Sequence, residues 1–123
     1  MAGIERFEDI DARKEGTELV NKVYRITGSG SFAKDFALRD QIRKAAVSIP
    51  SNIAEGFERN RRREFAQFLR YAKGSAGEVR SQLYHARDQG HIDDETFQTL
   101  RAEVASVSRQ IQGFIRHLEN NPR

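Results

Sequence analysis

Residues 97–118, FQTLRAEVASVSRQIQGFIRHL, place an apolar side chain at alternating steps of three and four positions. This a/d heptad spacing predicts a helix that packs nearly parallel to its neighbours, at a crossing angle of about 20°. Asp93 stands where an N-cap is expected, and Ile92 and Phe97 are spaced as a hydrophobic staple. We therefore expect a helix over residues 93–119 whose core positions are Phe97, Leu100, Val104, Val107, Ile111, Phe114 and Leu118.

Three further blocks carry apolar residues at helical spacing, and strand signals are absent. The first block, over about 9–27, ends at residues 28–31, GSGS, which we interpret as a flexible connector. The third, over 61–89, ends at Gly90, a typical C′ glycine. Its residues 74–77, GSAG, favour a close helix contact, within the bundle or between subunits. Short connections favour antiparallel neighbours, so the sequence predicts one all-α domain over 1–123, an antiparallel up-and-down four-helix bundle.

The second block keeps its apolar stripe in phase across Pro50. Proline cannot donate to the carbonyl of residue 46 and crowds it, which bends a helix without necessarily ending it. We predict one helix over 36–58 that is kinked at Pro50, and a break into two helices is the alternative. The stripe consists of Leu38, Ile42, Ala45, Ala46, Ile49, Ile53 and Phe57.

Composition limits the function classes. The chain has no cysteine, which excludes disulfides and thiolate sites and is typical of a reducing compartment. Residues 1–14 contain no apolar signal-peptide core, and no apolar run approaches the roughly 20 residues that span a bilayer. We expect a cytoplasmic protein without membrane contact.

Candidate catalytic and metal-ligating residues are few. The nearest match to a di-iron motif, Asp88-x-x-His91, straddles the helix end at Gly90. His85, His91 and His117 are interpreted as surface or interface residues, and no serine stands in a recognisable nucleophile motif. We therefore expect no enzyme activity, no metal and no cofactor.

Positive charge is concentrated in the middle of the chain. Residues 34–80 hold eleven Lys/Arg against six Asp/Glu, and residues 59–63 read RNRRR. If Asn60 caps the third helix, three arginines surround its free backbone N–H groups and form a phosphate receptor. A solvated turn is the alternative, of equal weight. No aromatic residue interrupts the run, so base stacking is not indicated. The candidate contacts are Arg59, Arg61, Arg62, Arg63, Arg43, Lys44, Arg70 and Lys73.

Residues 48–56, SIPSNIAEG, with 41–47, QIRKAAV, before them, resemble the four-helix bundle family of 23S rRNA intervening-sequence proteins. Phe7-Glu8-Asp9, Glu64-Phe65, Phe68-Leu69 and Gly90 also fit the family pattern, whereas residues 11–16 are more polar. The resemblance implies a bacterial protein that assembles into a homo-oligomeric, pentameric ring. A similar protein is the accessory variability protein of diversity-generating retroelements, which works with a reverse transcriptase and its RNA. The family has no established catalytic residues.

The same motif has a structural interpretation, which we favour over a binding role. Ser48 is expected to bond backbone carbonyls near the bend at Pro50, and Asn52 and Glu55 to bridge helices before Gly56. The leading hypothesis is thus a non-enzymatic oligomer that binds structured RNA or a ribonucleoprotein through its arginines. The alternative is a protein-interaction scaffold that docks a partner such as a polymerase, without nucleic-acid contact.

Overall fold

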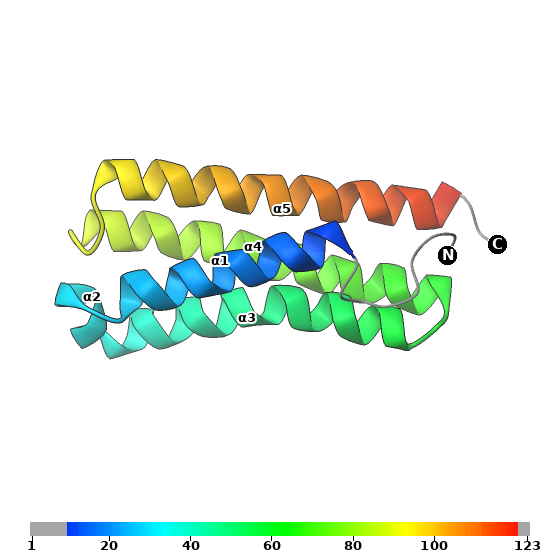
Figure 1. Cartoon of the computed structure of the whole chain (residues 1–123), viewed down its shortest axis with the longest axis horizontal. Coiled ribbons are helices and arrows are strands. Elements are labelled where there is room, and N and C mark those ends of the chain that lie inside the picture. The colour runs from blue at the N-terminus through cyan, green and yellow to red at the C-terminus, as the bar shows by residue number, and fades with distance from the viewer. Residues whose placement is uncertain (1–9, 121–123) are drawn as a thin grey trace.

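The computed structural model describes residues 10–120, which form five helices and no strand. They are α1 (Asp11–Thr27), α2 (Gly30–Lys34), α3 (Phe36–Glu58), α4 (Arg62–Asp88) and α5 (Asp94–Asn120). Figure 1 shows the four long helices side by side, each running opposite to the long helix before it. The all-helical prediction is confirmed. Phe7-Glu8-Asp9 lies outside the described residues.

The short helix α2 corrects the expectation of an unstructured connector after α1. Gly30 takes a left-handed φ of +64°, and the next turn buries the ring of Phe32. A single buried aromatic residue therefore holds this segment against the long helices. Five residues are too few to show an amphipathic period, so four helices were expected where the described residues form five.

The apolar stripes face one another, as their phase predicts. α3 packs on α1 and α4, and α5 packs on α4 and α1. The heptad pattern fails only near the end of α5, where Ile115 is buried and Phe114 is half-buried. A straight helix drifts by about 20° per heptad from a 3.5-residue repeat, which brings the neighbouring position into the core. Phe114 packs on Phe65 instead, with ring centroids 5.1 Å apart.

The helix α3 continues through Pro50, so the alternative of two separate helices is wrong. A bend at this point stays a prediction. Asn52 Nδ2 donates to the Ser48 carbonyl at 2.8 Å and to Ser48 Oγ at 3.0 Å. Ser75 Oγ of α4 donates to the same hydroxyl at 3.1 Å. The Ser48 hydroxyl therefore contacts the side chains of Asn52 and Ser75, where contacts with backbone carbonyls were expected. The hydrogen bond from α3 to α4 is made by Ser48, although Asn52 was expected to make it.

Close helix approach occurs at Gly56 and not at the expected glycines of α4. A Cβ atom on Gly56 would lie 2.7 Å from Cβ of Phe68. A Cβ atom on Gly74 or Gly77 would meet no atom within 4 Å. The prediction of a crowded contact within the bundle at these two glycines is wrong for the described chain, and a contact between subunits at this place stays a prediction.

The turn before α5 follows local capping rules. Gly90 has a φ of +76°, and the N–H of His91 donates to the Ala86 carbonyl at 2.9 Å. Asp93 Oδ1 accepts the N–H of Thr96 at 2.7 Å. The Thr96 side chain, followed by this N–H, lowers the pKa of the Asp93 carboxyl by hydrogen bonding to it. The predicted C′ glycine and N-cap are both confirmed. Within residues 10–120, no helix is long and apolar enough to cross a membrane.

Candidate nucleic-acid interface

The turn between α3 and α4 carries the arginine corner, which we define as Arg59, Arg61, Arg62 and Arg63. Asn60 was considered as the N-cap of α4, but it does not occupy that position. It follows the C-cap of α3 with a φ of +58°, a conformation that asparagine tolerates better than most residues. Arg61 is the N-cap of α4, so Arg62 and Arg63 occupy its first turn.

Arg59 is held by neighbours from both helices. Its Nε donates to Glu55 Oε2 at 2.9 Å, and Nη1 lies 3.5 Å from Glu64 Oε1. The guanidinium also lies over the Phe68 ring, 5.0 Å from its centroid. Glu55 was expected to bridge helices, but it pairs with Arg59 at the end of its own helix. The bridge is made by Arg59, whose charge is therefore largely neutralised.

The remaining three arginines of the corner differ in exposure and in ion pairing. The Arg61 side chain is 80% exposed, with Nε 3.6 Å from Glu64 Oε2. Arg62 is half-buried, and its Nε is covered without a hydrogen-bond partner in the described chain. Arg63 is exposed and forms no ion pair within residues 10–120. The uncompensated positive charge of the corner thus lies on Arg62 and Arg63.

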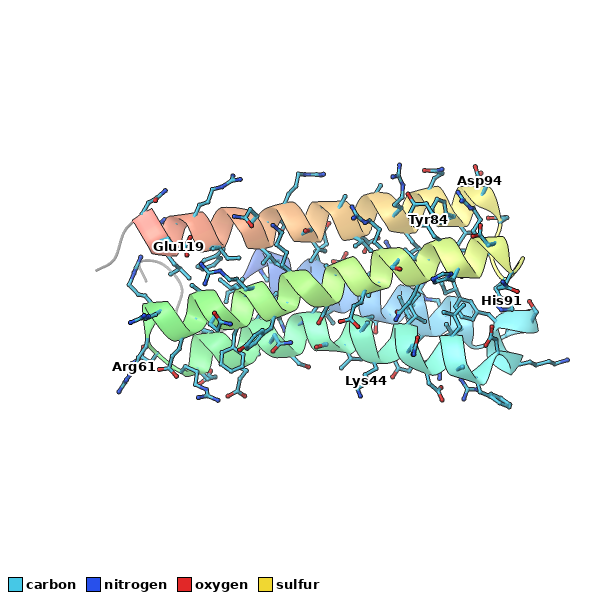
Figure 2. All side chains as sticks on the ribbon, turned by 180° about the vertical axis from the view of Figure 1, so that it is seen from behind. Lys44, Arg61, Tyr84, His91, Asp94 and Glu119 are labelled. Carbon is cyan, nitrogen blue, oxygen red and sulfur yellow. The ribbon has the colours of Figure 1, made fainter. Side chains whose placement is uncertain are left out.

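The supporting residues on α3 do not gather at this corner. Lys44 precedes Arg59 by fifteen positions, a separation of roughly 22 Å along a helix. Figure 2 shows Lys44 part-way along the molecule and Arg61 at its end. Arg43 faces α1 instead, where its Nε donates to Thr27 Oγ1 at 2.7 Å.

The supporting residues on α4 face α5. Arg70 pairs with Glu119, and Lys73 Nζ donates to Gln112 Oε1 at 2.6 Å. Both flank an open groove that contains Gly74. Because Arg70 is paired with a carboxylate, the four supporting residues do not extend the corner into one continuous basic surface.

A polar cluster at the other end of the molecule was missed from the sequence (Figure 2). His91 Nε2 lies 2.9 Å from Asp35 Oδ2, and His91 Nδ1 lies 2.8 Å from Ser31 Oγ. The imidazole also stacks on Phe32, with centroids 4.9 Å apart. The His91 side chain is only 9% exposed, so of the predicted surface or interface position the surface alternative is wrong and the interface alternative stays a prediction.

This cluster connects the α2 region to the turn before α5. Asp35 Oδ1 accepts the N–H of Leu38 at 3.3 Å and caps α3. The hydrogen bond from His91 is the main cause that lowers the pKa of the Asp35 carboxyl, followed by the Leu38 N–H. No local signal could have revealed the contact, because Asp35 and His91 are 56 positions apart.

The helices and the exposed arginine corner define a class, that of all-helical proteins with a basic turn at one end. Comparison with known families gives a narrower assignment. Residues 8–113 match the family of the 23S rRNA-intervening sequence protein. The chain therefore belongs to this family, as the motif at residues 48–56 indicated.

A solved structure shares the fold. It is the crystal structure of a protein of unknown function from the S23 ribosomal protein family of Bacteroides thetaiotaomicron. The two chains are 20% identical and superpose with a TM-score of 0.77, over 85% of this chain and 97% of the other. No curated protein matches this chain.

Proposed function

We propose that the four long helices form an antiparallel up-and-down bundle that binds structured RNA without catalysing a reaction. The arginine corner contacts phosphates, and assembly into a homo-oligomer repeats the corner on one particle. Three Glu residues, Glu55, Glu58 and Glu64, leave each corner with a balance of only +1. Avidity from several copies is what converts such a weak patch into useful affinity.

The observation that carries this proposal is the placement of Arg62 and Arg63 in the first turn of α4. The first N–H groups of a helix have no partner inside the helix and attract anions. A phosphate bound there meets these N–H groups and the guanidiniums together. Such contacts position a nucleic acid and carry no base information, so we expect weak sequence selectivity.

A catalytic role has less support. Glu55, on which a carboxylate pocket would depend, is exposed and paired with Arg59. In the Ser31–His91–Asp35 cluster, the carboxylate also serves as the N-cap of α3. Both arrangements suit a structural role.

The test compares two triple variants that remove the same charge. Arg61→Gln, Arg62→Gln and Arg63→Gln remove the corner. Arg101→Gln, Arg109→Gln and Arg116→Gln remove three exposed arginines from α5 and serve as the control. Binding to several unrelated RNA hairpins is measured by fluorescence anisotropy.

The corner variant should weaken binding to every hairpin by a similar factor, and the α5 variant should change it far less. An equal loss of RNA affinity in the two variants would mean that only the net charge of the protein matters, and it would contradict the proposal.

The second candidate function is a protein-interaction scaffold. Tyr71 on α4 is 51% exposed, and Val47 on α3 is also exposed. Large apolar side chains of this kind are common at protein interfaces. A partner that stays bound to the protein after nuclease treatment and at high salt would favour this function over RNA binding.

A further inference from the structure

Two exposed aromatic residues stand close to α2 in the chain, one near the end of α1 and one at the start of α3. Figure 1 shows α2 at one end of the molecule and the turn between α3 and α4 at the other. Phe36, the first residue of α3, is 63% exposed, and Tyr24 on α1 is 45% exposed. Phe36 has no polar atom in its side chain, so leaving it in water has a hydrophobic cost. Fold stability therefore does not account for a phenylalanine at this position.

Each ring is covered on one side by a guanidinium. Arg39 lies over Phe36 at 4.8 Å from the ring centroid, and Arg43 lies over Tyr24 at 4.5 Å. We call these four residues the aromatic–arginine strip. Its rings remain exposed even with the arginines against them, so each keeps surface for a further stacking partner.

The guanidiniums of the strip are held in place by other contacts. Arg43 Nε donates to Thr27 Oγ1 at 2.7 Å, and Arg39 Nη1 donates to the Ala33 carbonyl at 3.0 Å. Arg39 Nε also donates to Asp40 at 2.9 Å, whereas Arg43 forms no ion pair within the described residues. A held guanidinium loses little entropy when it binds an anion, and both side chains retain further N–H donors.

The residues of the strip form one continuous surface because of their spacing along α3. Phe36, Arg39 and Arg43 stand at i, i+3 and i+7, so they share one face of α3. The contact between Arg43 and Tyr24 extends this face onto α1. From Phe36 to Arg43 the helix rises by about 10 Å, which matches about three nucleotides stacked at 3.4 Å each.

We propose that the aromatic–arginine strip binds single-stranded RNA, with Tyr24 and Phe36 stacking on unpaired bases and Arg39 and Arg43 contacting phosphates. Aromatic faces beside guanidiniums are the groups by which proteins hold unpaired strands. Arg43 forms no ion pair within the described residues, so the strip favours an anionic partner. A second copy that covers the strip with a different surface, as in a ring, is an outcome of the test below. The choice of RNA over DNA rests on the function proposed above, but the strip is separate from the arginine corner.

The experiment separates the two sites by their ligands. Probes are a labelled oligouridine of about twelve nucleotides, which has no duplex, and a blunt RNA duplex. Variants are Tyr24→Ala with Phe36→Ala, Arg39→Gln with Arg43→Gln, and, as a control, Tyr84→Ala with Arg87→Gln. The control removes an aromatic–arginine pair on α4, where Arg87 lies 5.2 Å from the Tyr84 ring centroid.

Removing both rings should weaken oligouridine binding by at least about 10-fold and leave the salt slope unchanged, because stacking releases no counterions. Removing both arginines should weaken it and flatten the slope by up to about 1.4. Duplex binding should stay within about twofold in both variants, and the control should bind oligouridine like the wild type. A melting curve for each variant reports folding.

Three results would overturn the proposal. The first is that the wild-type protein does not bind oligouridine. The second is that the variant without both rings binds oligouridine as well as the wild type. The third is that this variant has a different subunit count by light scattering while it still binds oligouridine. Loss of duplex binding in the corner variant, with oligouridine binding retained, would leave both sites standing. Duplex binding unchanged in the corner variant, together with loss of oligouridine binding in the ring variant, would remove the arginine corner and keep the strip.

Discussion

His91 Nε2 lies 2.9 Å from Asp35 Oδ2, and this contact joins the turn before α5 to the first residue before α3. Both partners also hold a second group, since His91 Nδ1 meets Ser31 and Asp35 caps α3. The contact therefore fixes three chain segments at one end of the molecule. Asp35 directly precedes Phe36, the first residue of the aromatic–arginine strip. The contact with His91 therefore also helps to fix the positions of Phe36 and Arg39.

Acid should weaken this contact in a predictable direction. The pKa of Asp35 is lowered in the folded chain, chiefly by the His91 hydrogen bond. Its contribution to stability is therefore complete above the ordinary Asp pKa of about 3.9 and is lost as the pH falls through the lowered folded value. Asp35→Asn keeps a capping oxygen and removes the charge. The wild type should be more stable than this variant at pH 7, and the difference should shrink below about pH 4.

The measurement is urea unfolding of both proteins between pH 7 and pH 2. A stability difference that stays constant across this range would contradict a role for the Asp35 charge.

Gly56 should not tolerate a side chain. In Gly56→Ala the new Cβ would lie 2.7 Å from Phe68 Cβ and 3.0 Å from Phe65 Cδ1, so α3 and α4 must separate locally. Overpacking of this kind costs about 1–3 kcal/mol. Gly74→Ala and Gly77→Ala are matched controls, because an added methyl group meets nothing there. They should gain about 0.5–1 kcal/mol each from helix propensity. Equal stabilities for all three variants in thermal unfolding would be incompatible with this packing.

The hydroxyls of Ser48 and Ser75 should be energetically coupled. They are 3.1 Å apart and join α3 to α4 beside Pro50. Ser48→Ala, Ser75→Ala and the double variant form a cycle whose coupling should be about 0.5–1.5 kcal/mol, the usual net value of one hydrogen bond. The cycle is measured by urea unfolding, and a coupling near zero would mean that water replaces the bond without loss.

The sequence predicted best what depends on neighbouring residues. The stripe across Pro50 indicated one helix, and α3 begins at Phe36 and ends at Glu58. The N-cap role of Asp93 and the left-handed Gly90 follow from local chemistry. Asn60 was assigned to the wrong helix because asparagine suits both an N-cap and a left-handed C′ position.

The side-chain contacts between helices could not be predicted from the sequence, because they depend on how the helices are aligned along one another. Nothing near Arg70 indicates that Glu119 pairs with it, and nothing near His91 indicates Asp35. The same holds for Arg59, which lies over Phe68 although no aromatic residue interrupts the arginine run. These contacts divide the predicted basic surface into paired and unpaired arginines. This division depends on how α3, α4 and α5 pack, and it leaves Arg62 and Arg63 as the unpaired arginines of the corner within residues 10–120.

The most direct test of the central claim is the salt dependence of binding to one RNA hairpin. The logarithm of the binding constant is plotted against the logarithm of the salt concentration for the wild type and for Arg61→Gln/Arg62→Gln/Arg63→Gln. If the three guanidiniums contact phosphates, the slope of the variant should be flatter by about 2 to 3 for each corner that touches the hairpin, since each lost contact removes about 0.9. Parallel slopes, with or without a change in affinity, would show that the arginine corner does not touch the RNA.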